Sequence, residues 1–266
     1  MKLVTYESGG QTHAGVLVDG GVIDSGHATM GELLRAGVPS ELSGDPVQPD
    51  RLLPPVTDPE KIICIGLNYL SHAREQGGEP PETPTIFAKY RNALAAPGSE
   101  VKLPSYSSKV DYEAEVAFVI GKRAKDVDEA DALGYVAGYM LLNDLSARDM
   151  QFATPQWMPG KVFDGAAPCG PYLVTPDEAG PHDAIAIRLT LGGEEMQNGS
   201  TADLVHSIPA LVAYLSKLMT LEPGDIVSTG TPAGVGSLRD PRVWLSPGDE
   251  VVVESPTLGR LVTILA

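Results

Sequence analysis

Three carboxylates between residues 111 and 149 have the types and the spacing of a divalent-cation site. Glu113 and Glu115 lie two residues apart in the run DYEAEVAFVIGK, whose apolar residues predict a β-strand. Strand side chains alternate between faces, so both carboxylates point to the same side. Neighbouring carboxylates repel each other unless a positive charge lies between them. A hard cation with oxygen ligands meets that need, and Asp144, after the apolar run 139–142, is the third ligand we expect.

A simpler interpretation is that the two glutamates line the solvated face of an edge strand. Ala117 and Val119 share the predicted face with them, which favours a cavity wall over a solvent-exposed surface. Asp111 falls on the same face. It is a candidate for a further ligand or for a supporting acid.

Composition limits the kinds of partner and compartment that we expect. The formal net charge of -16 argues against a nucleic-acid or anionic-membrane partner, because phosphate binding needs clustered Lys and Arg. Two distant cysteines, Cys64 and Cys169, exclude a disulfide framework and a CxxC zinc site. The first residues contain no apolar signal region, and no apolar run has the length of a membrane span. We therefore expect a cytoplasmic protein.

The first 57 residues predict a small β-rich N-terminal domain. Short strand-like runs lie on both sides of a Gly-rich turn at residues 19–21, and a helix capped by Thr29 and ended by Gly37 follows. The Pro-rich segment 53–55 predicts a linker. We place the domain boundary near residue 57, which leaves residues 58–266 as the main domain.

A short helix after the strand 61–66 is expected to carry His72 and Glu75 as neighbours on one face. Asn68 is its predicted cap. A helix this short is marginal without tertiary contacts, so the segment is a candidate lid that becomes ordered when substrate binds. The alternative is an exposed pair of side chains without a function.

The remaining predicted segments contain fewer residues that could bind a ligand or take part in catalysis. Lys161 follows a glycine and is either a surface lysine or a group that holds a substrate carboxylate. The loop 229–236 lacks the lysine of a P-loop and is expected to approach a small oxyanion through its backbone. Helices are predicted at 128–133 and at 201–219, the second with a kink at Pro209. Pro-Gly turns at 223–224 and 247–248 lead into strands.

Six motifs in fixed order resemble the fumarylacetoacetate hydrolase family over about residues 60–266: NYxxHxxE, FxK, DYExE, NDxSARD, GKxFD and TGTPxGVG. The resemblance implies an α+β fold with a mixed β-roll or β-sandwich core, a few peripheral helices and a small N-terminal β-rich domain. It also implies a homodimer and a bound Mg²⁺ or Mn²⁺. The metal ligands would be Glu113, Glu115 and Asp144, in agreement with the strand argument.

The same resemblance assigns roles to the residues around the metal. His72 and Glu75 correspond to the lid-helix pair of the family, in which the histidine activates water and the glutamate orients it. Lys161 and Arg148 correspond to positions that contact the bound oxo-acid, and Lys161 is also a catalytic candidate. The other implied substrate contacts are Tyr69, Gln151 and Thr231.

The function that we predict first is metal-dependent hydrolysis of a C–C bond in acylpyruvate-type acids through a stabilised enolate. The alternative is an isomerase or decarboxylase of 2-hydroxy/2-oxo dienoic diacids, or an oxaloacetate decarboxylase. A hydratase or dehydratase of sugar-derived 2-oxo acids comes third. A non-catalytic carboxylate-binding module would lack His72 or Glu75, and both are present. The segments 149–160 and 239–244, the latter with Trp244, depart from the motifs and are candidates to shape the distal end of the substrate.

Overall fold

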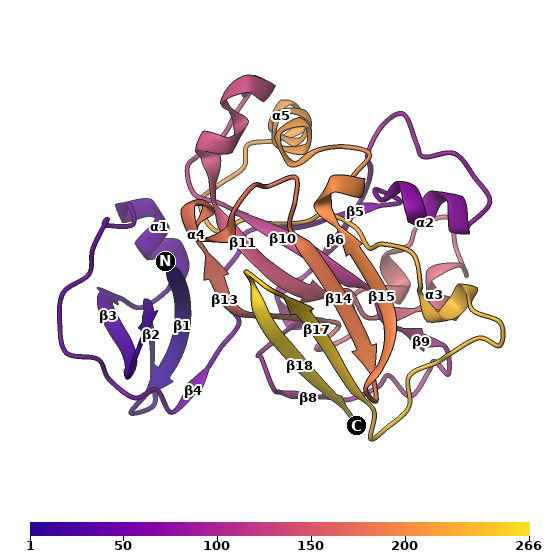
Figure 1. Ribbon diagram of the computed structural model, residues 1–266, viewed down its shortest axis with the longest axis horizontal. Helices are drawn as coiled ribbons and strands as arrows, with labels where there is room; N and C mark the ends of the chain where they lie inside the picture. Colours follow the sequence, from indigo (N-terminus) through magenta and orange to yellow (C-terminus); the bar gives the residue numbers. More distant parts are fainter.

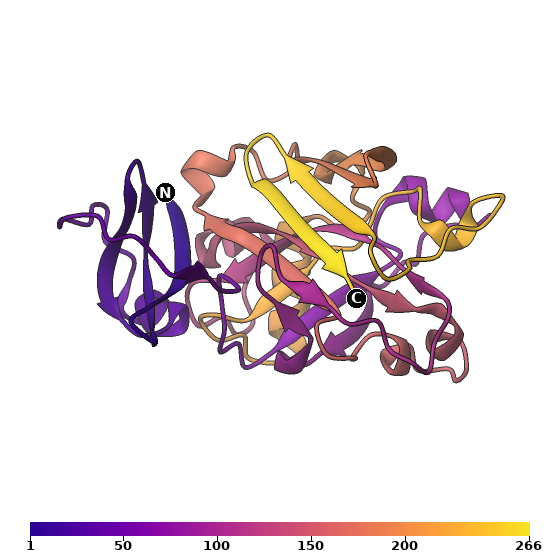
Figure 2. The same cartoon turned by 90° about the horizontal axis from the view of Figure 1, so that it is seen from below.

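The computed structural model describes residues 1–266 and has two mixed sheets with a few short helices around them (Figures 1 and 2). The larger sheet has eleven strands. Its order is β3 (Gly21–His27), β2 (Gln11–Val18), β1 (Lys2–Ser8), β13 (Ala167–Val174), β11 (Val136–Asn143), β10 (Ala114–Ile120), β16 (Ile226–Ser228), β5 (Ile62–Gly66) and β6 (Thr85–Lys89), with β4 (Arg51–Leu52) beside β1 and β7 (Leu94–Ala95) beside β13.

A smaller sheet and a two-stranded pair complete the β structure, and the α+β class predicted from the sequence is confirmed. The smaller sheet is β15 (Glu194–Ser200), β14 (Ala186–Leu191), β17 (Glu250–Ser255), β18 (Gly259–Leu265) and β8 (Glu100–Val101). The pair is β12 (Ser146–Ala147) with β9 (Val110–Asp111). The helices are α1 (Met30–Ala36), α2 (Leu70–Glu75), α3 (Arg148–Gln151), α4 (Pro176–Ala179) and α5 (Ile208–Leu218).

Strands β10 and β11 lie at the centre of the core. They pair antiparallel, with Ala114 opposite Asn143, and every residue of β10 is buried. The smaller sheet packs on them, since β14 contacts β10 while β17 and β18 contact β11. Strand β10 therefore has no solvated face, and the interpretation of its acids as an exposed edge is excluded. Burial on both sides also explains why Ala117 and Val119, on the face of the glutamates, are apolar.

The N-terminal residues form a lobe at one end of the long axis in both views (Figures 1 and 2). Strand β1 hydrogen-bonds to β13, with Lys2 opposite Val174, so the large sheet runs from the lobe into the body. Thr29 caps α1 by accepting a hydrogen bond from the Glu32 amide at 3.2 Å, and Gly37 ends the helix at φ 89°, as the sequence predicted. The domain boundary near residue 57 stays a prediction.

Asn68 does not cap α2, contrary to our expectation. Tyr69 occupies the cap position without a side-chain hydrogen bond. The Asn68 amide nitrogen donates to the carbonyls of His206 and Thr229, and its oxygen accepts from the His206 amide at 2.8 Å. A fully buried amide needs all of these partners, and tertiary backbone groups supply them here.

The region 201–219 is not one kinked helix. A 3-10 turn (Thr201–Asp203) is followed by α5, whose cap Ser207 accepts a hydrogen bond from the Ala210 amide. Pro209 lies in the first turn of α5, where the missing amide has no helical partner in any case, so no kink arises. The predicted helix at 128–133 is likewise a 3-10 helix (Glu129–Tyr135). None of the helices is long and apolar enough to span a bilayer.

Candidate active site

The three predicted metal ligands meet at the end of the β10–β11 pair. Glu113 precedes β10, Glu115 lies within it, and Asp144 follows β11, whose last residue pairs with the first residue of β10. The Asp144 amide donates to the Glu113 carbonyl at 2.9 Å. One carboxylate oxygen from each of the three buried acids lies within 4.8 Å of the others. The three acids expected from the sequence thus lie together, and their role as metal ligands stays a prediction.

Three buried cations surround two of these acids. The Lys161 ammonium is 2.7 Å from both Glu113 Oε2 and Asp144 Oδ2, and Lys89 Nζ is 2.7 Å from Asp144 Oδ1. Arg148 Nη2 is 2.6 Å from Glu113 Oε1. Burial acts to raise the pKa of Glu113, but Arg148 and Lys161 outweigh it and hold that pKa well below its usual range. Each of these two acids is therefore paired with two buried cations.

Glu115 is the acid without a cation of its own. Its Oε2 accepts hydrogen bonds from the Ser228 hydroxyl and from the Gly230 amide at 3.1 Å. Burial, with the charges of Asp144 and Glu113, raises its pKa to about 8. A buried carboxylate in this state calls for one more positive charge nearby. The oxygen-only donor set suits a hard cation such as Mg²⁺ or Mn²⁺, so the residues fit the metal that the sequence predicts.

Lys89 is a site residue that sequence reasoning missed. It ends β6, it is fully buried, and its ammonium also donates to the carbonyls of Lys161 at 2.5 Å and Ala166 at 2.9 Å. A lysine is almost never buried without such partners. What could have pointed to Lys89 in the sequence is its position as the last residue of the predicted strand TIFAK, within the motif FxK.

His72 and Glu75 form the predicted contact on α2. The two side chains are 2.8 Å apart, from Nδ1 to Oε2, and the other oxygen of Glu75 accepts from the Gly234 amide at 2.8 Å. The side-chain amide nitrogen of Gln76 is 3.0 Å from Nε2 of His72. These partners suit the neutral tautomer that donates from Nδ1 to Glu75 and carries its lone pair on Nε2.

The glycine-rich loop 229–236 binds carboxylates of the protein itself. Its amides donate to Glu115 from Gly230 and to Glu75 from Gly234, so one loop holds both the acid cluster and the α2 pair. The sequence predicts that this backbone approaches a ligand oxyanion, but these two amides meet carboxylates of the protein. Gly230 and Thr231 are the loop residues that line the cavity, and the Thr231 hydroxyl accepts a hydrogen bond from the Gln197 side chain at 2.7 Å.

Asp111 is not a ligand, which corrects one alternative from the sequence. Its Oδ2 is 2.9 Å from both Nε and Nη2 of Arg148, and the amides of Gly236 and Ser237 donate to its two oxygens at 2.8 and 3.0 Å. Arg148 Nη1 in turn donates to Gln151 at 2.9 Å. The acid therefore holds the guanidinium in place beneath the cavity.

These groups enclose a cavity of about 60 Å³. Seven predicted site residues line it: His72, Glu113, Glu115, Arg148, Gln151, Lys161 and Thr231. Asp144 lies beneath Lys161, and Glu75 lies behind His72. Tyr69 is fully buried and does not line the cavity, so its predicted contact with substrate has no support from its position.

Three aromatic residues complete the wall: Phe87, Phe152 and Trp157. The rings of Phe87 and Trp157 meet edge to face with centroids 5.8 Å apart, and the Lys161 ammonium lies 4.9 Å from the Phe87 centroid. Trp157 packs directly on Gly66, where an added Cβ would lie 2.2 Å from the indole. The segment 149–160 thus contributes to the wall of this inner cavity, whereas from the sequence we expect it at the distal end of the substrate.

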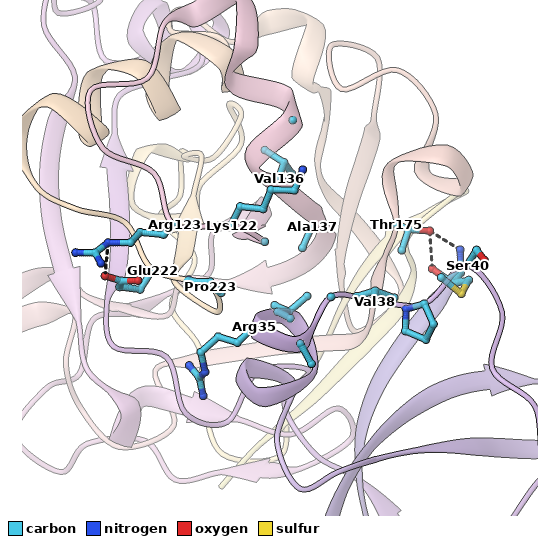
Figure 3. Close-up of a pocket in the computed structure, with 17 residues that line it drawn as sticks. Arg35, Val38, Ser40, Lys122, Arg123, Val136, Ala137, Thr175, Glu222 and Pro223 are labelled. Atoms are coloured by element: carbon cyan, nitrogen blue, oxygen red, sulfur yellow. Dashed lines mark hydrogen bonds and ion pairs between the residues drawn. The ribbon is translucent and has the colours of Figure 1, made fainter.

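A much larger cavity lies elsewhere, at the seam between α1 and the body (Figure 3). It measures about 800 Å³ and shares no lining residue with the carboxylate-lined cavity. Its one carboxylate, Glu222, pairs with Arg123 at 3.3 Å. No second acid lines this seam cavity, so its lining offers neither a carboxylate metal site nor a pair of acids for acid–base chemistry.

Comparison with known proteins gives consistent results. Residues 61–265 match the family model described as fumarylacetoacetate (FAA) hydrolase C-terminal. The chain is 42% identical over 243 residues to oxaloacetate tautomerase FAHD2A, mitochondrial, of Bos taurus, covering 90% of this chain and 77% of that protein. It spans about two thirds to three quarters of the length of such curated relatives.

Two solved structures show the same architecture. One is 5-carboxymethyl-2-hydroxymuconate delta-isomerase from Mycobacterium smegmatis, with TM-score 0.85 and 32% identity, covering 100% of this chain and 99% of that one. The other is fumarylpyruvate hydrolase from Pseudomonas aeruginosa in complex with Mn²⁺ and pyruvate, with TM-score 0.72 and 34% identity, covering 82% and 92%.

Proposed function

This chain belongs to the fumarylacetoacetate hydrolase family, and we propose that it catalyses keto–enol proton transfer in oxaloacetate-like 2-oxo acids. The observation that carries the proposal is the His72–Glu75 contact of 2.8 Å beside a carboxylate-lined cavity of about 60 Å³. Tautomerisation moves only protons and needs no second reactant, which suits so small a space. The name of the bovine relative supports the same reaction.

In this proposal His72 carries the proton. Its Nε2 lone pair takes a proton from the carbon next to the ketone and returns it to the enolate oxygen. In the reverse direction it takes the proton of the enol hydroxyl and delivers it to that carbon. Glu75 accepts the Nδ1 proton in a hydrogen bond, which fixes the tautomer and stabilises the imidazolium that forms. The Gly234 amide holds Glu75 in turn. The side-chain amide of Gln76 lies 3.0 Å from Nε2 of His72, so it must move away before this nitrogen can accept a proton.

The buried cations stabilise the negative charge of the enolate. Burial acts to lower the pKa of Lys161, but Asp144 and Glu113 raise it above its usual value, so this group stays an ammonium. Two of its three N–H groups face those carboxylates, which leaves one for a substrate oxygen. A divalent cation held by Glu113, Glu115 and Asp144 supplies a Lewis-acid charge for the oxygens of a 2-oxo acid.

The C–C hydrolase that we predicted first from the sequence is the second candidate. Its support is the fumarylpyruvate hydrolase structure, together with a His–Glu pair that can activate water as well as carry a proton. Isomerisation, decarboxylation and hydration begin from the same bound 2-oxo acid. The homodimer and the absence of nucleic-acid and membrane partners stay predictions, as does the cytoplasmic location, since the bovine relative is named as mitochondrial.

A substrate panel tests the proposal. EDTA-treated protein receives Mg²⁺ or Mn²⁺ and is mixed with enol oxaloacetate, acetylpyruvate or fumarylpyruvate. We expect metal-dependent loss of enol absorbance with oxaloacetate and no release of pyruvate. Metal-dependent release of pyruvate from a diketo acid, with enol oxaloacetate decaying at the uncatalysed rate, would refute the tautomerase proposal and support the hydrolase.

A further inference from the structure

An outer chamber of about 430 Å³ lies directly beside the carboxylate-lined cavity. Four side chains line both spaces: His72, Gln76, Arg148 and Phe152. The chamber is therefore the continuation of the inner cavity. A substrate too long for about 60 Å³ extends past these side chains into the chamber.

Two cations on the chamber wall have no carboxylate partner. Lys109 and Arg242 line the chamber, and neither takes part in an ion pair. Arg148 is compensated by Asp111 and Glu113, so it adds no free charge. The one acid on the wall, Asp149, already accepts hydrogen bonds from the Ser107 hydroxyl and the Met150 amide at its Oδ1. In a chain of net charge -16, such a positive wall is selective for an anionic group.

Two further residues of the wall are apolar and open to solvent. Phe152 is 68% exposed and Leu238 is 44% exposed, although both are large hydrophobic side chains. Trp244 is half-buried beside them. Apolar side chains exposed at the mouth of a site mark a surface that a ligand covers. They suit a hydrocarbon segment between the inner cavity and the two cations.

We propose that Lys109 and Arg242 bind a second carboxylate at the distal end of the substrate, which is then a 2-oxo diacid with a hydrocarbon spacer. This inference rests on the proposed function, since it takes the inner cavity as the place of the 2-oxo acid. Trp244 and Phe152 border the spacer, so both segments that depart from the sequence motifs act on the distal end.

The test compares two ligands that differ only in the distal charge. The dissociation constants of 2-oxoadipate and of its distal monomethyl ester are measured by calorimetry with Mg²⁺ present. In the wild-type protein we expect the diacid to bind roughly tenfold more tightly than the ester, as for one charge-assisted contact. In the double variant Lys109→Gln/Arg242→Gln this ratio falls to about one. Lys122→Gln, which removes one exposed charge at the seam cavity of Figure 3, keeps the wild-type ratio.

Two results would overturn the inference. One is a wild-type ratio near one, and the other is a double variant that still prefers the diacid as the wild type does. Binding is measured without turnover, so the outcome is independent of the reaction. If the protein binds the diacid through Lys109 and Arg242 but turns over no 2-oxo acid, the tautomerase proposal is refuted while the distal carboxylate site is supported.

Discussion

The carboxylate-lined cavity and the seam cavity differ in size and in content. The first measures about 60 Å³ and is lined by buried charges in mutual contact, whereas the second measures about 800 Å³ and is lined mostly by exposed or apolar groups (Figure 3). Charges interact strongly only where water is excluded. The candidate reactive groups of this protein therefore lie in the small enclosed cavity and not in the large open one.

Ion pairs in the two places illustrate this difference. Arg123 pairs with Glu222 at the seam while 73% of its side chain is exposed, so solvent screens the contact. Lys89 and Asp144 pair with side chains that are 0% exposed. The second pair is costly to break, because either partner alone would be a buried charge without compensation. Substitutions in the two regions are therefore expected to differ in their effects on stability and activity.

The largest effect is expected for Glu115→Ala. The substitution removes a ligand and the buried carboxylate whose pKa is raised to about 8, so cation binding is lost while the fold persists. We expect tautomerase activity to fall by about 10³-fold or more. Calorimetry with Mg²⁺ and circular dichroism are the measurements. An unchanged Mg²⁺ affinity would refute the ligand assignment.

Lys89→Met is expected to destabilise the fold most. It leaves Asp144 with one cation fewer in the interior, and breaking a buried pair costs about 3–5 kcal/mol. Urea denaturation measures the change in the free energy of unfolding. A loss below about 1 kcal/mol would mean that this lysine behaves as a surface residue.

Gly66→Ala and Gly134→Ala form a matched pair across the two cavities. A Cβ at Gly66 meets Trp157 at 2.2 Å, and we expect a loss of about 1–3 kcal/mol in stability together with weaker substrate binding. A Cβ at Gly134, on the seam, meets nothing within 4 Å, so its effect stays within about 1 kcal/mol. Equal thermal shifts for the two variants would contradict the packing of Trp157 on Gly66.

The smallest effect is expected for Lys122→Gln at the seam cavity. This lysine is exposed and forms no ion pair, so stability changes by no more than about 0.5 kcal/mol and turnover of oxaloacetate stays within about twofold. Steady-state kinetics and thermal unfolding provide the measurement. A large loss of turnover would give the seam a role in the reaction.

Local spacing was enough to predict the central parts of the site. Glu113 and Glu115 share a strand face, and His72 and Glu75 share a helix face, so each pair follows from the period of one element. The cap Thr29 and the Pro-Gly turns were predictable in the same way: Gly224 and Gly248 have φ of 97° and 93°, as type II turns require.

Long-range contacts account for what the sequence did not reveal. Lys89 is a site residue only because β6 places it beside Asp144, and Asn68 binds the backbone of His206 instead of capping its own helix. The amides of the glycine loop were expected to meet a ligand, but Glu75 and Glu115 reach them first. Each outcome depends on which strands and loops become neighbours, and no period in the chain encodes that.

The most direct test of proton transfer by the His72–Glu75 pair is deuterium exchange at the carbon next to the ketone. Oxaloacetate is placed in D₂O with Mg²⁺ and either the wild-type protein or His72→Gln, and the loss of the carbon-bound proton is followed by NMR. We expect the wild type to accelerate exchange well above the uncatalysed rate, and His72→Gln to lose about 10²–10⁴-fold of that acceleration while binding Mg²⁺ normally. Exchange at the wild-type rate in His72→Gln would contradict the role of this histidine.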